Sequence, residues 1–382
     1  MDDTYQVNPD WRKLASRVVK PQQIVLVIGA TDTGKSTFCR FLADFALAKG
    51  FKVACVDADI GQSQIGPPTT IGVKSFGPQS EIQLPSEQES ILESGQNRVE
   101  KNIVFDGTAD RLYFVGDVSP KGHFLETLTG TRLMVDNARE ADADFIIVDT
   151  TGYVHDPAAV ILKQHKIELI RPNHLICIGR SIEFKQITAC YSQQAWLNIH
   201  YLLPHQNARL KNSNTRSGYR KDRFDTYFSE SCVQQLPFEQ VRGGRTPFFI
   251  GRPANEKELE ILAGLAETQV YHAEWGNRTL CFIGSQHLSK AIITRIKNYL
   301  SLTRVTVEVS TYFERRLVGL IDSTGDTYVI GIIEAVDFQK RELSVRCKTD
   351  AVKQACAIQF GDYQLRSSKQ AGVNRTEPNG QD

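Results

Sequence analysis

Eight residues near the start of the chain have the types and spacing of a loop that binds nucleotide phosphates. Residues 29–36 read GATDTGKS, which fits the pattern G-x-x-x-x-G-K-[ST]. In such a loop the backbone N–H groups point inward at phosphate oxygens, the lysine reaches the β- and γ-phosphates, and the hydroxyl ligates Mg²⁺. Lys35 and Ser36 are predicted to take these two roles. The chain is therefore predicted to bind a nucleoside triphosphate together with Mg²⁺.

The flanking sequence predicts the elements that would position this loop. Residues 24–28, IVLVI, are typical of a fully buried strand. After the loop, apolar residues recur at helical spacing and Gly50 follows the last of them. A helix is therefore predicted there, with its positive N-terminal end toward the phosphates. The residues predicted to contact the nucleotide are Gly29, Thr31, Asp32, Thr33, Gly34, Lys35, Ser36 and Thr37.

Three aspartates stand where predicted strands end. Asp57 and Asp59 follow the apolar residues 52–56 at a spacing of two, so both side chains face the same way if the backbone is extended. Asp149 ends the apolar run 145–148. A Mg²⁺–triphosphate site needs one carboxylate near the metal, and a kinase needs another to take the proton of the attacking hydroxyl. The alternative is that these aspartates only end strands or cap helices.

Residues 149–152, DTTG, also fit the D-x-x-G switch of GTPases, which makes a GTPase the main rival interpretation at this level. The element that usually reads guanine, N-K-x-D, is not found anywhere in the 382 residues. Its absence from the sequence disfavours a GTPase-like switch.

A basic, polar segment at residues 211–223 carries Arg216, Arg220 and Arg223 at spacings of four and three. If the segment is helical, the three side chains share one face. Arginine suits phosphate because its planar guanidinium donates two parallel hydrogen bonds. Such an element could close on a transferring phosphoryl group. The alternative is a solvated basic face of a helix.

Predicted strands and helices alternate over the first part of the chain. Further strands are predicted at residues 112–115 and 175–178, with helices at 11–19 and 133–140. This alternation predicts an α/β fold with a parallel sheet flanked by helices, and ligands bound at the carboxyl ends of its strands.

Beyond residue 245 the pattern changes to short strands. Residues 303–309 alternate polar and apolar types, and residues 317–321 and 329–333 flank the turn sequence STGD. We therefore predict a phosphate-loop domain over residues 1–245, with a closing segment, or lid, at about 211–228. A smaller, mostly β domain is predicted over 246–366, followed by a disordered tail over 367–382.

Composition excludes several classes of protein. The 45 Lys and Arg nearly balance the 44 Asp and Glu, so any surface that binds nucleic acid must be local. The eight cysteines include no C-x-x-C, which disfavours zinc fingers and a disulfide framework. The first residues, MDDTYQVNPDW, are polar and acidic, unlike a signal peptide, and no apolar run approaches the ~18 residues of a membrane span. A cytoplasmic protein without membrane contact is expected.

Taken together, these motifs resemble the polynucleotide 5′-hydroxyl kinases, the RNA-kinase family that includes the kinase subunit of the eukaryotic pre-mRNA cleavage complex. The family forms are found in GATDTGKS, in D-x-D-x-G-Q at residues 57–62 followed by GPPTTIG, and in RSGYRKDRFDTYF at 216–228. The family's clasp, T-x-G-W, is similar to residues 150–153, TTGY. Residues 317–337 resemble its C-terminal β domain. The chain is most similar to the short prokaryotic members.

The resemblance implies transfer of the ATP γ-phosphate to the 5′-hydroxyl of RNA, or of DNA. The implied catalytic residues are Lys35, Asp59 as general base, and the lid arginines Arg216 and Arg220. The implied metal set is Ser36, Asp57 and Asp149. The residues implied to contact the polynucleotide are Gln62, Thr150, Gly152, Tyr153 and Arg223.

The sequence departs from the family in one position of the clasp and leaves two questions open. Tyr153 stands where the family has tryptophan, which keeps a stacking face with less area. Larger members hold adenine with an N-terminal domain, so the residues that hold adenine here, and the choice between ATP and GTP, stay open. A regulatory subunit that binds ATP without turnover is a second alternative. The presence of Lys35, Asp59 and the arginines disfavours it.

Overall fold

The computed structural model describes residues 4–77, 98–100, 105, 107–205, 207–208 and 210–365. The predicted tail over 367–382 lies outside these residues. The chain divides into two compact units, the first formed by Met1–Ser229 with Asp326–Tyr328 and the second by the remainder. The sequence analysis put the boundary at residue 245. The division falls earlier because strand β10 (Ser231–Pro237) pairs along its whole length with β18 (Glu342–Lys348) of the second unit.

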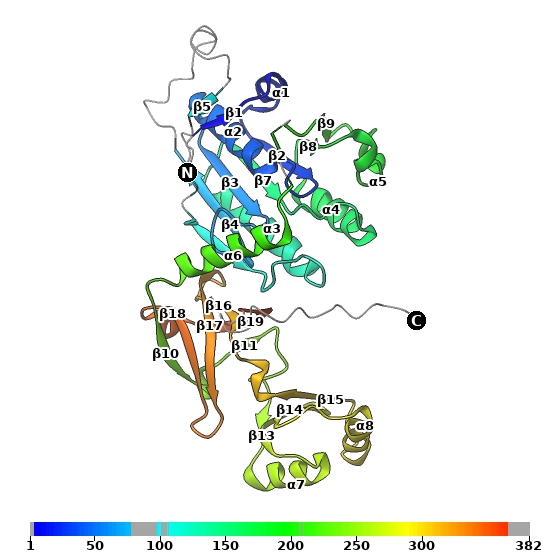
Figure 1. Ribbon diagram of the computed structural model, residues 1–382, viewed down its shortest axis with the longest axis vertical. Helices are drawn as coiled ribbons and strands as arrows, with labels where there is room; N and C mark the ends of the chain where they lie inside the picture. The colour runs from blue at the N-terminus through cyan, green and yellow to red at the C-terminus, as the bar shows by residue number, and fades with distance from the viewer. Residues whose placement is uncertain are drawn as a thin grey trace. The chain divides into compact units, whose positions relative to one another are not determined.

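The first unit is built on a mostly parallel sheet (Figure 1). In pairing order its strands are β6 (Arg111–Phe114), β4 (Thr70–Phe76), β3 (Val53–Ala58), β7 (Phe145–Thr150), β2 (Gln23–Gly29), β8 (His174–Ile178) and β9 (Asn198–Leu202). The five strands from β3 to β9 in this order run parallel, whereas β4 and β6 pair antiparallel. A small antiparallel pair joins β1 (Thr4–Gln6) to β5 (Arg98–Glu100).

Helices cover both faces of this sheet. On β2, Val25 and Val27 pack into a core with α1 (Pro9–Val18) and α2 (Lys35–Ala48). The alternate residues Leu26 and Ile28 pack into a second core on the other face, with α3, α4 and α5. Those helices span Phe124–Glu140, Pro157–Ile170 and Lys185–Thr188, and α6 spans Ser213–Tyr227. Burial on both faces is the reason that the strands read as continuous apolar runs.

The register of the sheet brings the predicted site residues to one edge. Strands β2, β7 and β3 are neighbours and parallel, so their carboxyl ends lie together. Asp57 of β3 is paired directly with Asp149 of β7, and β2 ends at Gly29, where the phosphate-binding loop begins. The α/β fold class predicted from the sequence is confirmed.

The second unit contains two sheets, each described here by its pairing. One runs in the order β11 (Gly243–Gly244), β19 (Ala357–Gln364), β16 (Arg316–Ile321), β17 (Thr327–Asp337), β18 and β10. The other runs β12 (Arg252–Pro253), β13 (Val270–Gly276), β14 (Thr279–Gly284) and β15 (Arg304–Val309).

Helices α7 (Glu256–Ala266) and α8 (Lys290–Tyr299) pack on the second of these sheets through an apolar core that includes Leu262, Phe282 and Ile296. A short helix, α9, spans Ala351–Gln354. Among the described residues, no helix combines the length and the apolar character that crossing a membrane requires.

Candidate active site

The loop between β2 and α2 has the backbone conformation that cradles phosphate. Gly34 caps α2 with φ +90° and Asp32 lies at φ 62°, so the backbone curls around the start of the helix. A Cβ added to Gly29 would lie 2.9 Å from the carbonyl oxygen of Ile178, so β8 leaves no room for a side chain there. The ammonium of Lys35 donates to the carbonyl of Ala30 at 2.8 Å, within the loop. The lysine is thus held beside the positions that phosphate oxygens occupy in such loops.

Ser36, on the first turn of α2, faces Asp149 at the end of β7. The Ser36 hydroxyl donates to Oδ2 of Asp149 at 2.5 Å, and Oδ1 of the same carboxylate accepts the N–H of Thr150. Mg²⁺ prefers oxygen ligands, and a hydroxyl and a carboxylate that touch each other provide two of the required type. Ser36 and Asp149 would therefore hold the ion.

Asp57 and Asp59 have different environments although they are two residues apart. Oδ2 of Asp57 accepts the N–H groups of Gln64 and Ile65, and Oδ1 accepts that of Asp59. Burial raises the pKa of Asp57 to about 7, and the nearby charges of Asp149 and Asp59 act in the same direction. Asp57 thus holds the loop that follows β3 in shape.

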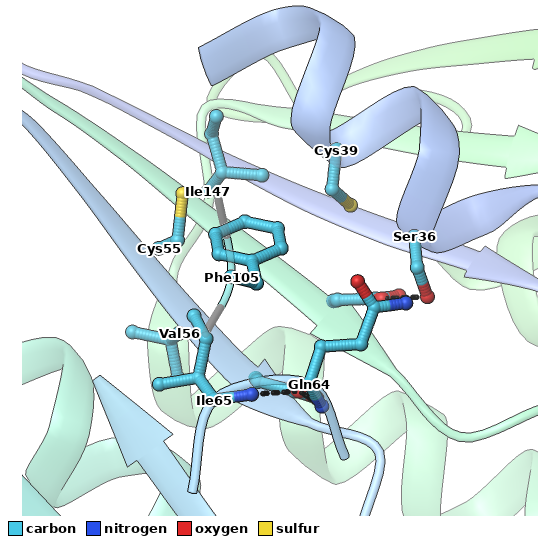
Figure 2. A pocket seen from close by; sticks show the side chains of 10 residues that line it. Ser36, Cys39, Cys55, Val56, Gln64, Ile65, Phe105 and Ile147 are labelled. Carbon is cyan, nitrogen blue, oxygen red and sulfur yellow. Dashed lines mark hydrogen bonds between the residues drawn. The ribbon is translucent and has the colours of Figure 1, made fainter. Parts of the chain in front are cut away.

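Asp57 and Asp149, both predicted to hold the metal, line a small pocket whose other walls are largely apolar (Figure 2). Besides Ser36, the pocket is lined by Cys39, Cys55, Phe105 and Ile147. Apolar walls on one side remove water from Asp57 and Asp149, which raises the pKa of both carboxyl groups. For Asp149 this effect is opposed by Lys35 and by the hydrogen bond from Ser36.

Asp59 instead faces a cavity of about 260 Å³ in front of the loop. Its Oδ1 accepts the N–H groups of Gly61 and Gln62, each at 3.2 Å. Within the described part of the chain, Oδ2 has no hydrogen-bond partner. The predicted residues that line this cavity are Thr31, Asp32, Gly34, Lys35, Ser36, Thr37, Asp59 and Gln62. One cavity therefore unites the loop with Asp59 and Gln62.

The predicted lid is the helix α6, and its first turn contacts the phosphate-binding loop. The guanidinium of Arg216 lies 3.3 Å from Oδ2 of Asp32 and donates to the carbonyl of Lys211 at 2.8 Å. The N–H of Lys211 donates to the same carboxylate oxygen at 2.9 Å. Asp32, predicted as a nucleotide contact, therefore also anchors the start of the lid.

Further along α6 the contacts move to the loop after β3. The hydroxyl of Tyr219 donates to the carbonyl of Ser63 at 3.0 Å, and Arg223 donates to that of Gly66 at 2.8 Å. Arg220 lies between them, and its Nε is buried without a hydrogen-bond partner among the described residues. Because the guanidinium of Arg220 makes no hydrogen bond to another described residue, it is available for an anion.

Tyr219, Gln64 and Ala208 also line the cavity and were not predicted as site residues, and Lys211 was predicted only as the start of the basic segment. For Tyr219 the signal was present. It follows Arg216 by three residues, so on a helix it must share the face of the arginines. For Ala208 and Gln64 the residue types gave no signal.

The clasp, Thr150–Tyr153, packs directly on the phosphate-binding loop. A Cβ added to Gly152 would lie 2.5 Å from the backbone nitrogen of Thr31, so only glycine fits at this contact. Thr150 is fully buried, and its hydroxyl donates to the carbonyl of Val27 at 2.8 Å. The Tyr153 ring is half-buried, with its centroid 6.4 Å from that of Phe124. Of these residues, Tyr153 offers an aromatic face.

Comparison with known proteins identifies relatives along most of the chain. The family profile described as "mRNA cleavage and polyadenylation factor CLP1 P-loop" matches residues 29–230. The polyribonucleotide 5′-hydroxyl-kinase of Methanocaldococcus jannaschii is 31% identical over 346 residues, which cover 90% of this chain and 86% of that protein. The corresponding kinase of Pyrococcus furiosus is 26% identical, covering 95% and 94%.

A solved structure with the same fold is that of wild-type Clp1p in complex with Pcf11p. The TM-score is 0.56 at 13% identity, and the match covers 93% of this chain and 79% of that one. The structural similarity is evidence for the fold, and the sequence matches are evidence for the family. The chain belongs to the CLP1 P-loop family, alongside the archaeal polyribonucleotide 5′-hydroxyl-kinases.

Proposed function

We propose that the chain transfers the γ-phosphate of ATP to the 5′-hydroxyl end of RNA. The main support for this proposal is that Lys35, Ser36 and Asp59 line one cavity, together with Tyr219 of α6. The phosphate-binding loop supplies the donor site, and a carboxylate that lines the same cavity supplies the base that a hydroxyl acceptor needs. The names of the archaeal relatives support the same activity, with RNA as the acceptor.

Each residue of the cradle would have a separate role. Lys35 would leave the Ala30 carbonyl and bind the β- and γ-phosphate oxygens. Ser36 and Asp149 would hold Mg²⁺, which when bound neutralises charge on the β- and γ-phosphates. Asp32 fixes the start of the lid through Lys211 and Arg216, which would bring α6 to the same phosphates.

Asp59 is the residue best suited to take the proton of the attacking hydroxyl. Its Oδ1 is held by two backbone N–H groups, and its Oδ2 has no partner in the described part of the chain. It also lines the cavity, which Asp57 does not. A fixed carboxylate with one free oxygen at the cavity wall can accept a proton without reorganising.

Changing Asp59 to asparagine should lower kcat by a factor of ~10²–10⁴, because general-base catalysis contributes about that much. The affinity for ATP–Mg²⁺ should stay within a few-fold, since the asparagine side chain would keep an oxygen for the backbone N–H groups of Gly61 and Gln62. Steady-state kinetics together with nucleotide titration separate the two quantities. A collapse of ATP–Mg²⁺ affinity with a preserved rate at saturation would assign Asp59 to the metal instead.

Tyr153 is proposed to stack on the base of the terminal nucleotide, a contact worth ~1–3 kcal/mol and tolerant of sequence. Tyr153→Ala should therefore raise the KM for the oligonucleotide by about tenfold or more, with the KM for ATP unchanged. Tyr153→Trp should keep or lower the KM for the oligonucleotide, because indole has the larger face. An alanine variant with the oligonucleotide KM of the parent would reduce Tyr153 to a packing residue against Phe124.

The assay that tests the proposal uses purified protein, ATP or GTP labelled in the γ-phosphate, and RNA or DNA oligonucleotides of one sequence. Each oligonucleotide is supplied with a 5′-hydroxyl and, as the control, with a 5′-phosphate. Transfer of label to the 5′-hydroxyl RNA and not to the 5′-phosphorylated control is the expected result. Release of free phosphate without transfer would favour a GTPase-like switch, and tight ATP binding without turnover would favour a regulatory subunit.

A further inference from the structure

Helix α4 carries two lysines, Lys163 and Lys166, that are fully buried although no role has been assigned to either. They are three residues apart, so they lie one above the other on the same face of the helix. Burying an ammonium group is costly unless hydrogen bonds compensate it. Lys163 makes such hydrogen bonds and Lys166 makes none to the described residues, and this difference suggests a role for Lys163.

All the hydrogen bonds of Lys163 go to the clasp. Its ammonium donates to Oγ1 of Thr150 at 2.8 Å and to the carbonyl oxygen of Thr151 at 2.9 Å, and Oγ1 of Thr151 lies at 3.5 Å. None of these acceptors is a carboxylate. Burial lowers the pKa of Lys163 well below its usual value, and the charges of Lys166 and Lys35 act in the same direction. Burying an amino group without a carboxylate partner costs folding free energy. Groups whose pKa is strongly shifted by burial cluster at functional sites.

The clasp is also fixed by the phosphate-binding loop and the strand before it. Gly152 lies so close to Thr31 that no side chain fits between them. The hydroxyl of Thr150 accepts from Lys163 and donates to the carbonyl of Val27, two residues before the loop begins. The clasp is therefore held both by β2 with its loop and by the side chain of Lys163.

We propose that Lys163 is a positioning residue for the polynucleotide acceptor, which holds Thr150–Tyr153 at a fixed place against the phosphate-binding loop. The inference rests on the proposed function, because it takes the clasp to be the part that contacts the acceptor. Holding the clasp on the loop that binds the donor fixes the separation between the 5′-hydroxyl and the γ-phosphate. Displacement of a reacting group by about 1 Å can cost ~10²-fold in rate.

Lys166 provides a matched control on the same helix. Its Nζ is buried and has no hydrogen-bond partner among the described residues, so it makes no hydrogen bond to the clasp. Lys163→Met and Lys166→Met make the same nearly isosteric change and remove the same amino group, one turn apart. Lys163→Met alone removes the donor for Thr150 and Thr151.

The experiment compares the two methionine variants in the full chain by two readouts. The first is kinetic, with kcat and the KM for a 5′-hydroxyl RNA measured beside the dissociation constant of ATP. The second is amide hydrogen exchange over residues 150–156. For Lys163→Met we expect kcat/KM for the RNA to fall by ~10²-fold, ATP affinity to stay within about twofold, and exchange in the clasp to accelerate. For Lys166→Met we expect none of these changes.

Equal kinetic and exchange effects in both variants would overturn the inference, because the cause would then be a general disturbance of α4. Parent-like kinetics and exchange in a folded Lys163→Met would overturn it too. If Lys163→Met does not fold, Lys163→Gln and Lys166→Gln replace the pair. The glutamine side chain is one carbon shorter than lysine and is expected to weaken the bonds to Thr150 and Thr151. Equal effects of the two glutamine variants would then overturn the inference. A parent protein that phosphorylates no oligonucleotide would defeat the proposed function, whereas the exchange readout would still decide whether Lys163 holds the clasp.

Discussion

Replacing Lys35 with alanine should abolish phosphoryl transfer while leaving the protein folded. In the structure the Lys35 ammonium donates to the Ala30 carbonyl, and with ATP it would bind the β- and γ-phosphates. Charge on these oxygens shifts as transfer proceeds, so the loop's lysine stabilises the transition state. Removing it should therefore raise the barrier to transfer. We expect transfer of label to the RNA to fall to background, with a melting temperature close to that of the parent.

Lys49→Ala is the matched control, because Lys49 is exposed just past the end of the same helix. Its removal should leave the rate of transfer unchanged. Near-parental turnover in a folded Lys35→Ala variant would show that the loop binds phosphate without serving the reaction. The proposed mechanism would then be wrong at its central residue.

The parts of the site that could be predicted are those set by local sequence. The apolar strand, the loop and the helix that follows it are contiguous, and each has a local signal in periodicity or glycine position. Asp57, Asp59 and Asp149 could be predicted as neighbours because parallel strands end at one edge of the sheet. The register then pairs Asp57 with Asp149.

Features that depend on contacts distant in sequence could not be predicted. Lys163 lies in a helix where a lysine normally extends its charge into water, and nothing local indicates that its ammonium turns inward to the clasp. The sequence also could not predict that β4 runs antiparallel to both of its neighbours, β3 and β6, because the pattern of apolar residues in a strand does not encode its direction. The end of the first unit at Ser229 depends on the pairing of β10 with β18, more than a hundred residues later.

Arg220→Ala should lower kcat by about 10³-fold, with ATP affinity within a few-fold of the parent. Arginines that stabilise a transferring phosphoryl group contribute at least this much in related chemistry. Arg216 pairs with Asp32, and Arg223 donates through Nη2 to the carbonyl of Gly66. The guanidinium of Arg220 makes no hydrogen bond to another described residue, and its Nε is buried. Arg220 is therefore the lid arginine that can respond to charge on the transferring group. A contact formed mainly in the transition state lowers kcat and barely changes ground-state binding.

Two further variants make this prediction specific. Arg220→Lys should restore little of the rate, because an ammonium cannot make the two-pronged contact of a guanidinium. Lys221→Ala, at the next position of α6, removes an exposed cation that pairs with Asp225 and should leave kcat unchanged. Full rescue by lysine would mean that only net positive charge is needed near the phosphates. If Arg220→Ala itself turns over like the parent, the arginines of α6 form a solvated basic face, and the charge of the transferring group must be stabilised by Lys35 and the metal site.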